Sequence, residues 1–255
     1  MAVIEVNFFS NSLKRMVPFQ MILPVGKRYS KPGDTDGPFK TLYLLHGLRG
    51  NYKDWVVYTE IQYLAEKSNL AVVMPSGENS CYVEQLIPDN DFGEYVGHEL
   101  VEITRKMFPL SDKREDTFIG GLSMGGFGAL RNGFKYAENF SKIVALSAAL
   151  HFFESPLEKP IENIYHEERV FGDRGIALLS DKNPRVAFEN LRKNDIGIPE
   201  IYMACGLQDS LLWANQSFKD FLVENGAKVN YEETEGEHNW TFWNSQIPQF
   251  IKWLF

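Results

Sequence analysis

Short apolar runs alternate along this chain with stretches in which apolar residues recur every three or four positions. The first two runs, residues 3–9 and 19–23, are joined by polar residues, a pattern that predicts an antiparallel hairpin. Six further runs follow, and the middle four are apolar at consecutive positions, as in strands buried on both faces of a sheet. These six runs are residues 41–45, 70–74, 117–119, 142–146, 200–204 and 228–232.

Helical periodicity fills the gaps between these runs. It is clearest in residues 97–108, which Pro109 ends, in 218–222 before Gly226, and in the apolar stripe of 240–254. Alternating strands and helices favour a mostly parallel sheet with helices on both faces. We therefore predict an α/β fold with an eight-stranded sheet that begins with antiparallel strands.

One long segment interrupts the alternation. Residues 151–185 contain Pro156, Pro160 and the Phe171-Gly172-Asp173 turn, and no run in them resembles a strand. A loop-rich insertion of this length in a compact domain is usually functional. We predict one domain over residues 1–255, with a cap or lid insertion at about 151–185.

Composition narrows the classes of partner. The 255-residue chain is 44% hydrophobic and 24% charged, as in ordinary globular proteins. Its net charge of −8 disfavours nucleic acid and anionic membranes, which both reward basic surfaces. No apolar stretch is long enough to cross a bilayer, and no signal peptide opens the chain. A cytoplasmic protein is expected, and a homo-oligomer is compatible with these features.

The strongest chemical motif is Gly121-Leu122-Ser123-Met124-Gly125, which lies between an apolar run and a helical pattern. A strand, a sharp turn and a helix in this order form a nucleophile elbow, which holds the serine hydroxyl out of the sheet. A phosphate-binding glycine loop is the alternative, but the glycine spacing and the missing Gly-Lys-Ser/Thr disfavour it. Ser123 is therefore the candidate nucleophile.

The candidate base is a histidine later in the chain. His151 and His166 fall in the predicted cap, whereas His238 follows the last predicted strand and precedes the last helix. Loops at the carboxyl edge of the sheet can deliver an imidazole to the serine hydroxyl. We assign His238 as the base; a solvated loop histidine is the alternative.

The candidate acid is expected between the nucleophile and the base. Asp209 follows the run 200–204, whereas Asp181 and Asp195 follow no strand. A carboxylate there would orient the imidazole and stabilise its charged form. A turn or helix-cap role for Asp209 is the alternative.

Two backbone N–H groups are expected to bind the developing oxyanion. One is that of Met124, which follows the nucleophile, and the other is that of Leu48 in His46-Gly47-Leu48-Arg49-Gly50. His46 is expected to have a structural role beside this hole. Tyr82, Trp213 and Trp240 are candidate substrate contacts because they lie close in sequence to predicted site loops, although such aromatic residues more often pack in the core.

These motifs together resemble the esterase D-like family of α/β-hydrolases over nearly the whole chain. The resemblance rests on Leu44-Leu45-His46-Gly47-Leu48, Gly121-x-Ser123-x-Gly125, Gly206-x-x-Asp209 and Gly236-x-His238-Asn239-Trp240. It is greatest to the tributyrin and acetyl esterase branch, which is related to feruloyl esterases and S-formylglutathione hydrolases. It implies hydrolysis of a small-molecule ester through an acyl-serine, without a metal or an organic cofactor.

Two departures bear on the substrate. Arg49-Gly50 stands where formylglutathione hydrolases usually have Thr-Cys, and Leu122 stands where they usually have His before the nucleophile. A short-chain acyl esterase is therefore expected, acting on acetyl to butyryl esters of small alcohols and including acylated carbohydrates and hydroxycinnamates. An S-formylglutathione hydrolase-like thioesterase and an acyltransferase with the same triad are the alternatives.

Overall fold

A single eight-stranded sheet forms the centre of the molecule. The computed structural model describes residues 1–26, 37–156, 167–194 and 196–255, and its strands lie in the order β1-β2-β4-β3-β5-β6-β7-β8. β2 pairs antiparallel with both β1 and β4, and the remaining pairs are parallel. The predicted sheet with its antiparallel start is confirmed. The strands are β1 (Ala2–Ser10), β2 (Arg15–Leu23), β3 (Lys40–Leu45), β4 (Leu70–Pro75), β5 (Thr117–Leu122), β6 (Lys142–Leu146), β7 (Glu200–Gly206) and β8 (Val229–Thr234).

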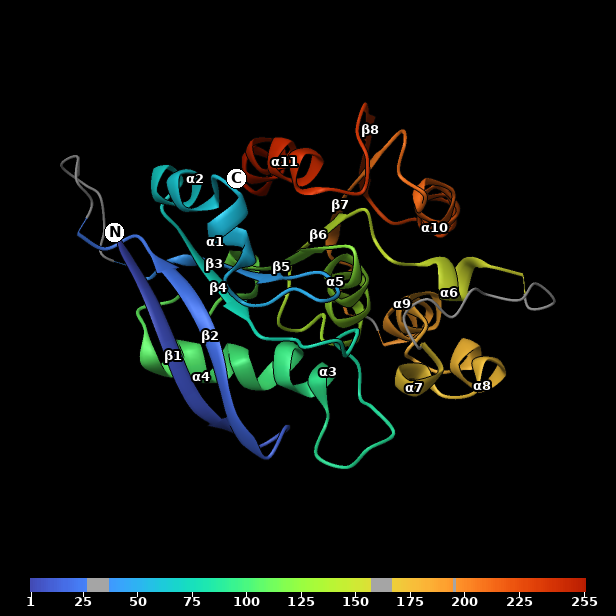
Figure 1. Cartoon of the computed structure of the whole chain (residues 1–255), viewed down its shortest axis with the longest axis horizontal. Coiled ribbons are helices and arrows are strands. Elements are labelled where there is room, and N and C mark those ends of the chain that lie inside the picture. The colour runs from blue at the N-terminus through green and yellow to red at the C-terminus, as the bar shows by residue number, and fades with distance from the viewer. Residues whose placement is uncertain (27–36, 157–166, 195) are drawn as a thin grey trace.

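Helices cover both faces of this sheet (Figure 1). Helices α1, α2 and α11 pack on one face, where they bury Leu42 of β3, and α4, α5, α9 and α10 pack on the face that buries the next residue, Tyr43. Successive strand residues thus enter different cores, which is why the central runs are apolar at every position. The helices are α1 (Asp54–Tyr58), α2 (Ile61–Lys67), α3 (Phe92–Glu94), the π-helical turn η1 (Tyr95–Glu99), α4 (Leu100–Met107), the 3₁₀ turn η2 (Arg114–Asp116), α5 (Met124–Lys135), α6 (His151–Glu154), α7 (Glu167–Phe171), α8 (Arg174–Leu179), α9 (Pro184–Lys193), α10 (Leu212–Glu224) and α11 (Trp240–Leu254).

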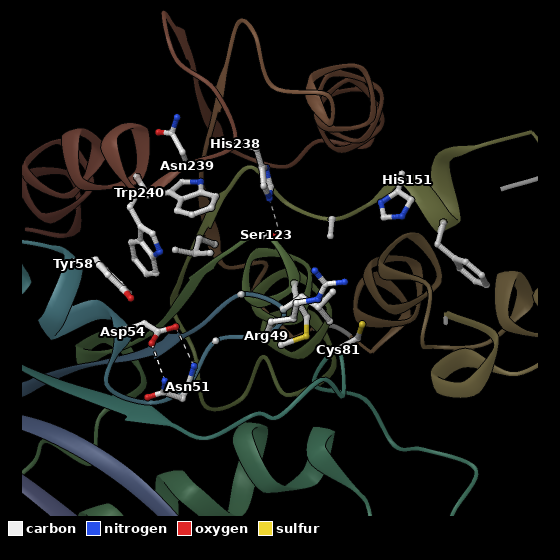
Figure 2. Close-up of a pocket in the computed structure, with 18 of the residues that line it drawn as sticks. Arg49, Asn51, Asp54, Tyr58, Cys81, Ser123, His151, His238, Asn239 and Trp240 are labelled. Carbon is white, nitrogen blue, oxygen red and sulfur yellow. Dashed lines mark hydrogen bonds between the residues drawn. The ribbon is translucent and has the colours of Figure 1, made fainter. Parts of the chain in front are cut away.

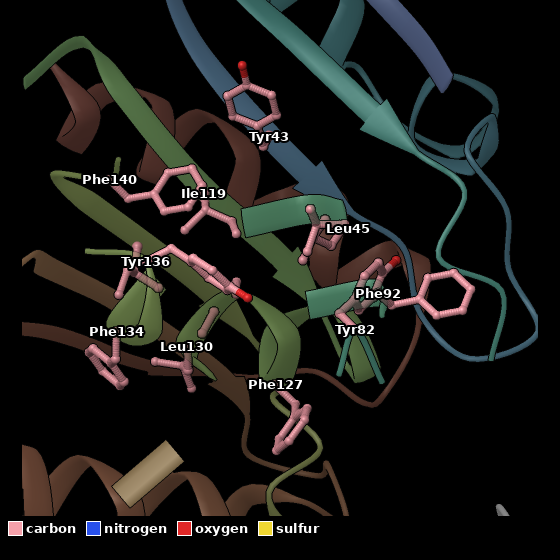
Figure 3. Packing of buried hydrophobic residues seen from close by; sticks show 14 of the residues in the cluster. Tyr43, Leu45, Tyr82, Phe92, Ile119, Phe127, Leu130, Phe134, Tyr136 and Phe140 are labelled. Carbon is pink, nitrogen blue, oxygen red and sulfur yellow. The ribbon is translucent and has the colours of Figure 1, made fainter. Parts of the chain in front are cut away.

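The core on the α5 side is rich in aromatic residues. Figure 3 shows Tyr43 and Ile119 on the sheet, and Phe127 and Leu130 on the side of α5 away from it, and these four side chains are at most 1% exposed. Burial of each large apolar side chain contributes about 1.5–3 kcal/mol. The helix that follows Ser123 is therefore firmly fixed against the sheet.

Three boundaries differ from the sequence prediction. β2 begins at Arg15 rather than at residue 19, because the four residues from Arg15 to Pro18 also pair with β1, as far as Ser10. β5 extends through Gly120 and Gly121 to Leu122, since these glycines still pair with β6. The helix predicted at 97–108 is preceded by α3 and η1, so that helical structure begins at Phe92.

The predicted cap segment, residues 151–185, contains no strand in its described part. It consists there of α6, α7, α8 and the start of α9. Residues 157–166, including His166, lie outside the described residues. Figure 1 shows these helices beyond α5, on the side of the molecule away from the β1–β2 hairpin.

Candidate active site

Ser123 occupies a strained turn between β5 and α5. Its backbone has φ +53° and ψ −117°, a conformation that costs a non-glycine residue roughly 1–3 kcal/mol. The turn is held from both sides: the Ser123 N–H donates to the Leu146 carbonyl at 2.8 Å, and its carbonyl accepts from Phe127 and Ala149. This geometry is that of a nucleophile elbow.

Two glycines allow this turn to be so tight. A Cβ on Gly121 would lie 2.5 Å from the carbonyl carbon of Gly125. A Cβ on Gly125 would clash with the Leu45 carbonyl oxygen and lie 2.7 Å from that of His46. The start of α5 can therefore contact the end of β3 only because neither position has a side chain.

The elbow, the β8–α11 loop and the β7–α10 loop bring three polar side chains together, and Figure 2 shows two of them, Ser123 and His238, joined by a dashed line. His238 Nε2 lies 2.9 Å from Ser123 Oγ, and His238 Nδ1 lies 2.8 Å from Asp209 Oδ2. Because the carboxylate can only accept, Nδ1–H donates to it and the Nε2 lone pair is left for the serine hydroxyl. The three predicted residues thus form one hydrogen-bonded chain.

Asp209 is held in its ionised form. Its side chain is fully buried, whereas that of His238 is 33% exposed. Burial raises the pKa of Asp209, but the hydrogen bonds from His238 and from the Leu211 N–H outweigh burial, so the pKa lies below its ordinary value. A charged acid is therefore maintained beside the imidazole.

Ser147 and Trp243 lie next to this acid and the base. The buried Ser147, which follows β6 with φ +46°, accepts from Trp243 Nε1 at 3.1 Å, and its hydroxyl helps to lower the pKa of Asp209. The Trp243 ring also stands edge-on to His238, with ring centroids 5.0 Å apart. Trp243 and Ser147 thus link the orientations of the acid and the base.

The β3–α1 loop approaches the elbow from the other side. His46 is 1% exposed; its Nε2 accepts from the Gly77 N–H at 2.9 Å, so Nδ1 carries the proton and donates to the Gly47 carbonyl at 2.7 Å. Burial lowers the pKa of His46, against the opposing effects of the Gly47 hydrogen bond and the Asp54 charge. A neutral His46 therefore fixes the turn that carries Leu48. Its structural position agrees with the role expected from the sequence.

These loops enclose a pocket of about 580 Å³, a size typical of small-molecule sites. Leu48 and Met124 line it together with Ser123. Met124 is the first residue of α5, so its N–H has no carbonyl partner within the helix. The described residues that line the pocket are Gly47, Leu48, Arg49, Gly50, Asn51, Asp54, Tyr58, Cys81, Leu122, Ser123, Met124, Ala149, His151, Phe152, Phe171, His238, Asn239, Trp240 and Trp243.

Of the three predicted substrate contacts, only Trp240 lines this pocket. Tyr82 is fully buried because its turn, with φ +55°, directs the ring beneath the loop, where its hydroxyl donates to the His46 carbonyl at 3.0 Å. Trp213 is 45% exposed in the first turn of α10. Neither is among the described lining residues of the pocket: Tyr82 supports the β3–α1 loop from below, and Trp213 faces solvent.

Sequence reasoning missed several lining residues on each side of Ser123. Asp54 and Tyr58 lie four residues apart, on one face of α1 directly after the oxyanion loop, and this spacing was a usable signal. His151, Phe152 and Phe171 come from the cap segment, whose fold no local pattern reveals. Figure 2 shows Tyr58, Asp54 and Trp240 on one side of Ser123, and His151 and Cys81 on the other.

The described residues contain neither a metal-binding cluster nor a membrane-spanning helix. Within the described ranges, no three His, Cys, Asp or Glu side chains are grouped in a way that could hold a metal ion. None of the helices in that part of the chain is both long and apolar enough to cross a bilayer. The predicted cytoplasmic location and the oligomeric state stay predictions.

Comparison with known proteins points to one group of enzymes. Residues 10–254 match the Esterase family. The chain is 45% identical over 262 residues to an acetyl esterase of Caldicellulosiruptor saccharolyticus, covering 100% of this chain and 98% of the relative. Two solved structures from Staphylococcus aureus also superpose on 99% of this chain and 98% of their own. They are the fluorophosphonate-binding serine hydrolase F in a substrate-bound form (TM-score 0.86, 29% identity) and an S-formylglutathione hydrolase apoenzyme (TM-score 0.84, 28% identity).

The family match spans almost the entire chain, and the acetyl esterase is similar from end to end. The eight-stranded sheet and the elbow geometry agree with both comparisons. The chain therefore belongs to the Esterase family, and it is a carboxylic ester hydrolase with the α/β-hydrolase fold.

Proposed function

We propose that this enzyme hydrolyses short-chain acyl esters through an acyl-serine on Ser123, with His238 as general base and Asp209 as the acid that orients it. The observation that carries the proposal is the continuous hydrogen-bonded chain of 2.9 Å and 2.8 Å from the Ser123 hydroxyl to the buried carboxylate. Each member also has the environment that its role requires: a hydroxyl on a strained turn that lines the pocket, a partly exposed imidazole and a buried ionised acid.

In the first half of the reaction, Ser123 Oγ bonds to the ester carbonyl carbon while His238 Nε2 takes the hydroxyl proton. The carbonyl oxygen becomes an oxyanion, which the N–H groups of Leu48 and Met124 would stabilise; one such donor contributes about 3–4 kcal/mol. When the bond to the alcohol oxygen breaks, His238 returns the proton to the leaving group. Asp209 stabilises the imidazolium in between.

In the second half, His238 takes a proton from water as the water oxygen bonds to the acyl carbon. The bond to Ser123 Oγ then breaks, and the proton passes to the serine. The products are a carboxylic acid and the regenerated enzyme. Acetyl to butyryl groups are favoured because Phe152 and Phe171, with ring centroids 4.7 Å apart, narrow the pocket beside Ser123.

We further propose that the segment 151–185 is a cap within a single domain 1–255. Its support is that His151, Phe152 and Phe171 from this segment line the same pocket as Ser123. The segment is joined to the body of the molecule by ion pairs, as between Asp181 and Lys135 of α5 at 2.8 Å. A cap of this kind would determine which acyl groups or alcohols enter.

A panel of p-nitrophenyl esters tests the acyl preference. We expect kcat/KM to be highest for acetate and butyrate and to fall for octanoate and dodecanoate, because the aromatic wall limits chain length. Rates that rise steadily from butyrate to dodecanoate would contradict a short-chain preference. Varying the alcohol separately at fixed acetyl, with acylated sugars and hydroxycinnamate esters included, would identify the leaving group.

A thioesterase is a second candidate, because the chain resembles the S-formylglutathione hydrolase of S. aureus at 28% identity over almost its full length. The departures at Arg49 and Leu122 favour oxygen esters. S-formylglutathione and an acetyl ester compared at equal enzyme concentration would separate the two activities. Adding sugar or alcohol acceptors and analysing the products would reveal acyl transfer.

A further inference from the structure

One charged side chain in the pocket has no part in the proposed reaction. Arg49 is exposed, lines the pocket beside Ser123 and follows Leu48 directly. Its backbone has φ +61° in a turn closed by the Gly50 N–H and the Gly47 carbonyl at 3.1 Å. Glycine would adopt this conformation at no steric cost. A left-handed arginine here therefore indicates that the side chain itself has a use.

The position of Arg49 is fixed although its side chain is exposed. Its N–H donates to Asn79 Oδ1 at 2.8 Å, which ties the turn to the loop after β4. The same turn rests on the neutral His46, whose ring donates to the Gly47 carbonyl. The guanidinium thus starts from a rigid backbone next to the reacting atoms.

Within the part of the chain that the structure describes, the Arg49 guanidinium has no acidic partner. Among the described residues, no carboxylate forms an ion pair with its guanidinium. Asp54 is the one acidic side chain that lines the described pocket, and it accepts from the Asn51 N–H at 3.0 Å and from Asn51 Nδ2 at 2.9 Å. Figure 2 shows Asp54 on the Tyr58 side of Ser123, while the Arg49 guanidinium lies beside Ser123 toward Cys81 and His151.

We propose that Arg49 forms an anion subsite, and that the preferred esters carry a carboxylate a few atoms from the scissile carbonyl. This inference rests on the proposed function of Ser123. A guanidinium offers a planar fork of N–H donors that matches a carboxylate, and such charge-assisted bonds are about twice as strong as neutral ones. The net charge of −8 repels anions at long range, so only a local cation of this kind could favour them.

The carboxylate could belong to either half of the ester, and matched substrates distinguish the halves. The acyl pair is p-nitrophenyl hemisuccinate and p-nitrophenyl butyrate, which differ by a carboxylate in place of a methyl group. The alcohol pair is 3-acetoxybenzoate and its methyl ester, followed by acetate release. For each pair, the ratio of kcat/KM for the charged ester to that for the neutral ester is the quantity of interest.

We expect the wild type to favour the charged member of one pair. Arg49→Met should lower that ratio by about tenfold or more, since hydrogen bonds between charged groups are the strong ones. Arg49→Lys keeps the charge without the fork and should recover part of the ratio. Lys53→Met is the matched control, because Lys53 is an exposed cation of the same loop that pairs with Glu5 at 2.8 Å outside the pocket. It should leave the ratio unchanged.

Two results would overturn the subsite. The wild type could show no preference in either pair, or Arg49→Met could leave both ratios unchanged. If the ratios stayed unchanged while both members of a pair fell equally, Arg49 would act on the oxyanion rather than on a substrate anion. Failure of the proposed function looks different, since neutral esters would then be hydrolysed no better than by Ser123→Ala.

Discussion

The elbow and the cap segment border the same pocket, but they are fixed in different ways. At the elbow, backbone meets backbone: Gly121 and Gly125 leave no room for a side chain, and Ser123 is held by three main-chain hydrogen bonds. In the cap segment, side chains make the attachment. Glu154 of α6, whose side chain is 2% exposed, accepts from Ser217 Oγ of α10 at 2.6 Å and from the Arg185 guanidinium of α9 at 2.8 and 2.6 Å.

A second cluster, made of ion pairs, joins the cap segment to α5. Arg131 of α5 is fully buried and contacts Glu84 at 2.6 Å and Asp181 at 3.3 Å, and Lys135 lies 2.8 Å from Asp181. Main-chain contacts set distances within narrow limits, whereas ion pairs can be broken one at a time. The difference suggests a division: the elbow determines the chemistry, and the cap determines which ester is accepted.

The largest effect should come from the elbow itself. Ser123→Ala removes the attacking oxygen, so kcat for p-nitrophenyl acetate should fall by about 10⁴-fold or more. The thermal midpoint should change little, because the strained turn is held by main-chain bonds that alanine also forms. Ser141→Ala, at the opposite edge of the sheet, is the control for a lost hydroxyl. Appreciable residual turnover in Ser123→Ala would show that another group is the nucleophile.

The next effect tests the cap attachment. Arg185→Met leaves Glu154 buried without its cation, so the free energy of unfolding should fall by about 3–5 kcal/mol. Because α6 carries His151 and Phe152, KM should rise more than kcat falls. Chemical denaturation and steady-state kinetics would measure both.

The double variant Glu154→Met/Arg185→Met is the matched control for this pair. Its two apolar side chains leave no buried charge, so it should recover much of the lost stability. If Arg185→Met were as stable as the wild type, the pair would be no anchor. If it changed kcat more than KM, the proposed division between chemistry and selection would be wrong.

The smallest effect concerns the groups that orient the triad. Ser147→Ala removes a hydroxyl that lowers the pKa of Asp209, so the carboxylate becomes more basic and stabilises the imidazolium more strongly. The acid limb of the kcat/KM profile should therefore move to higher pH, and the maximal rate should fall by up to about tenfold.

Ser147→Gly separates the hydroxyl from the backbone strain. It should show the same pH shift but be more stable than Ser147→Ala, since glycine tolerates φ +46°. An unmoved acid limb in both variants would leave Ser147 with a purely structural role.

The elements that could be predicted from the sequence are those that depend on local patterns. The elbow has a motif, and Asp209 and His238 each follow a strand, so chain order was enough to find them. The buried central strands were recognisable because both of their faces enter a core.

The rest depends on contacts between distant residues. Nothing near Tyr82 in the sequence reveals that its turn directs the ring inward beneath His46. His151 and Phe171 line the pocket in a segment that ion pairs join to α5, as between Asp181 and Lys135, and such pairs have no local signature. Ser147 looks like an ordinary residue at the end of a strand until β6 is placed next to β7.

The contact of Gly125 with the Leu45 and His46 carbonyls has a consequence for the behaviour of the enzyme on heating. This contact joins α5 to the β3–α1 loop without any side chain that could change rotamer. Warming should therefore loosen the cap while the reacting groups keep their spacing. An enzyme built in this way would become less selective among esters before it became inactive, and a broadened substrate range would be the first sign of thermal damage.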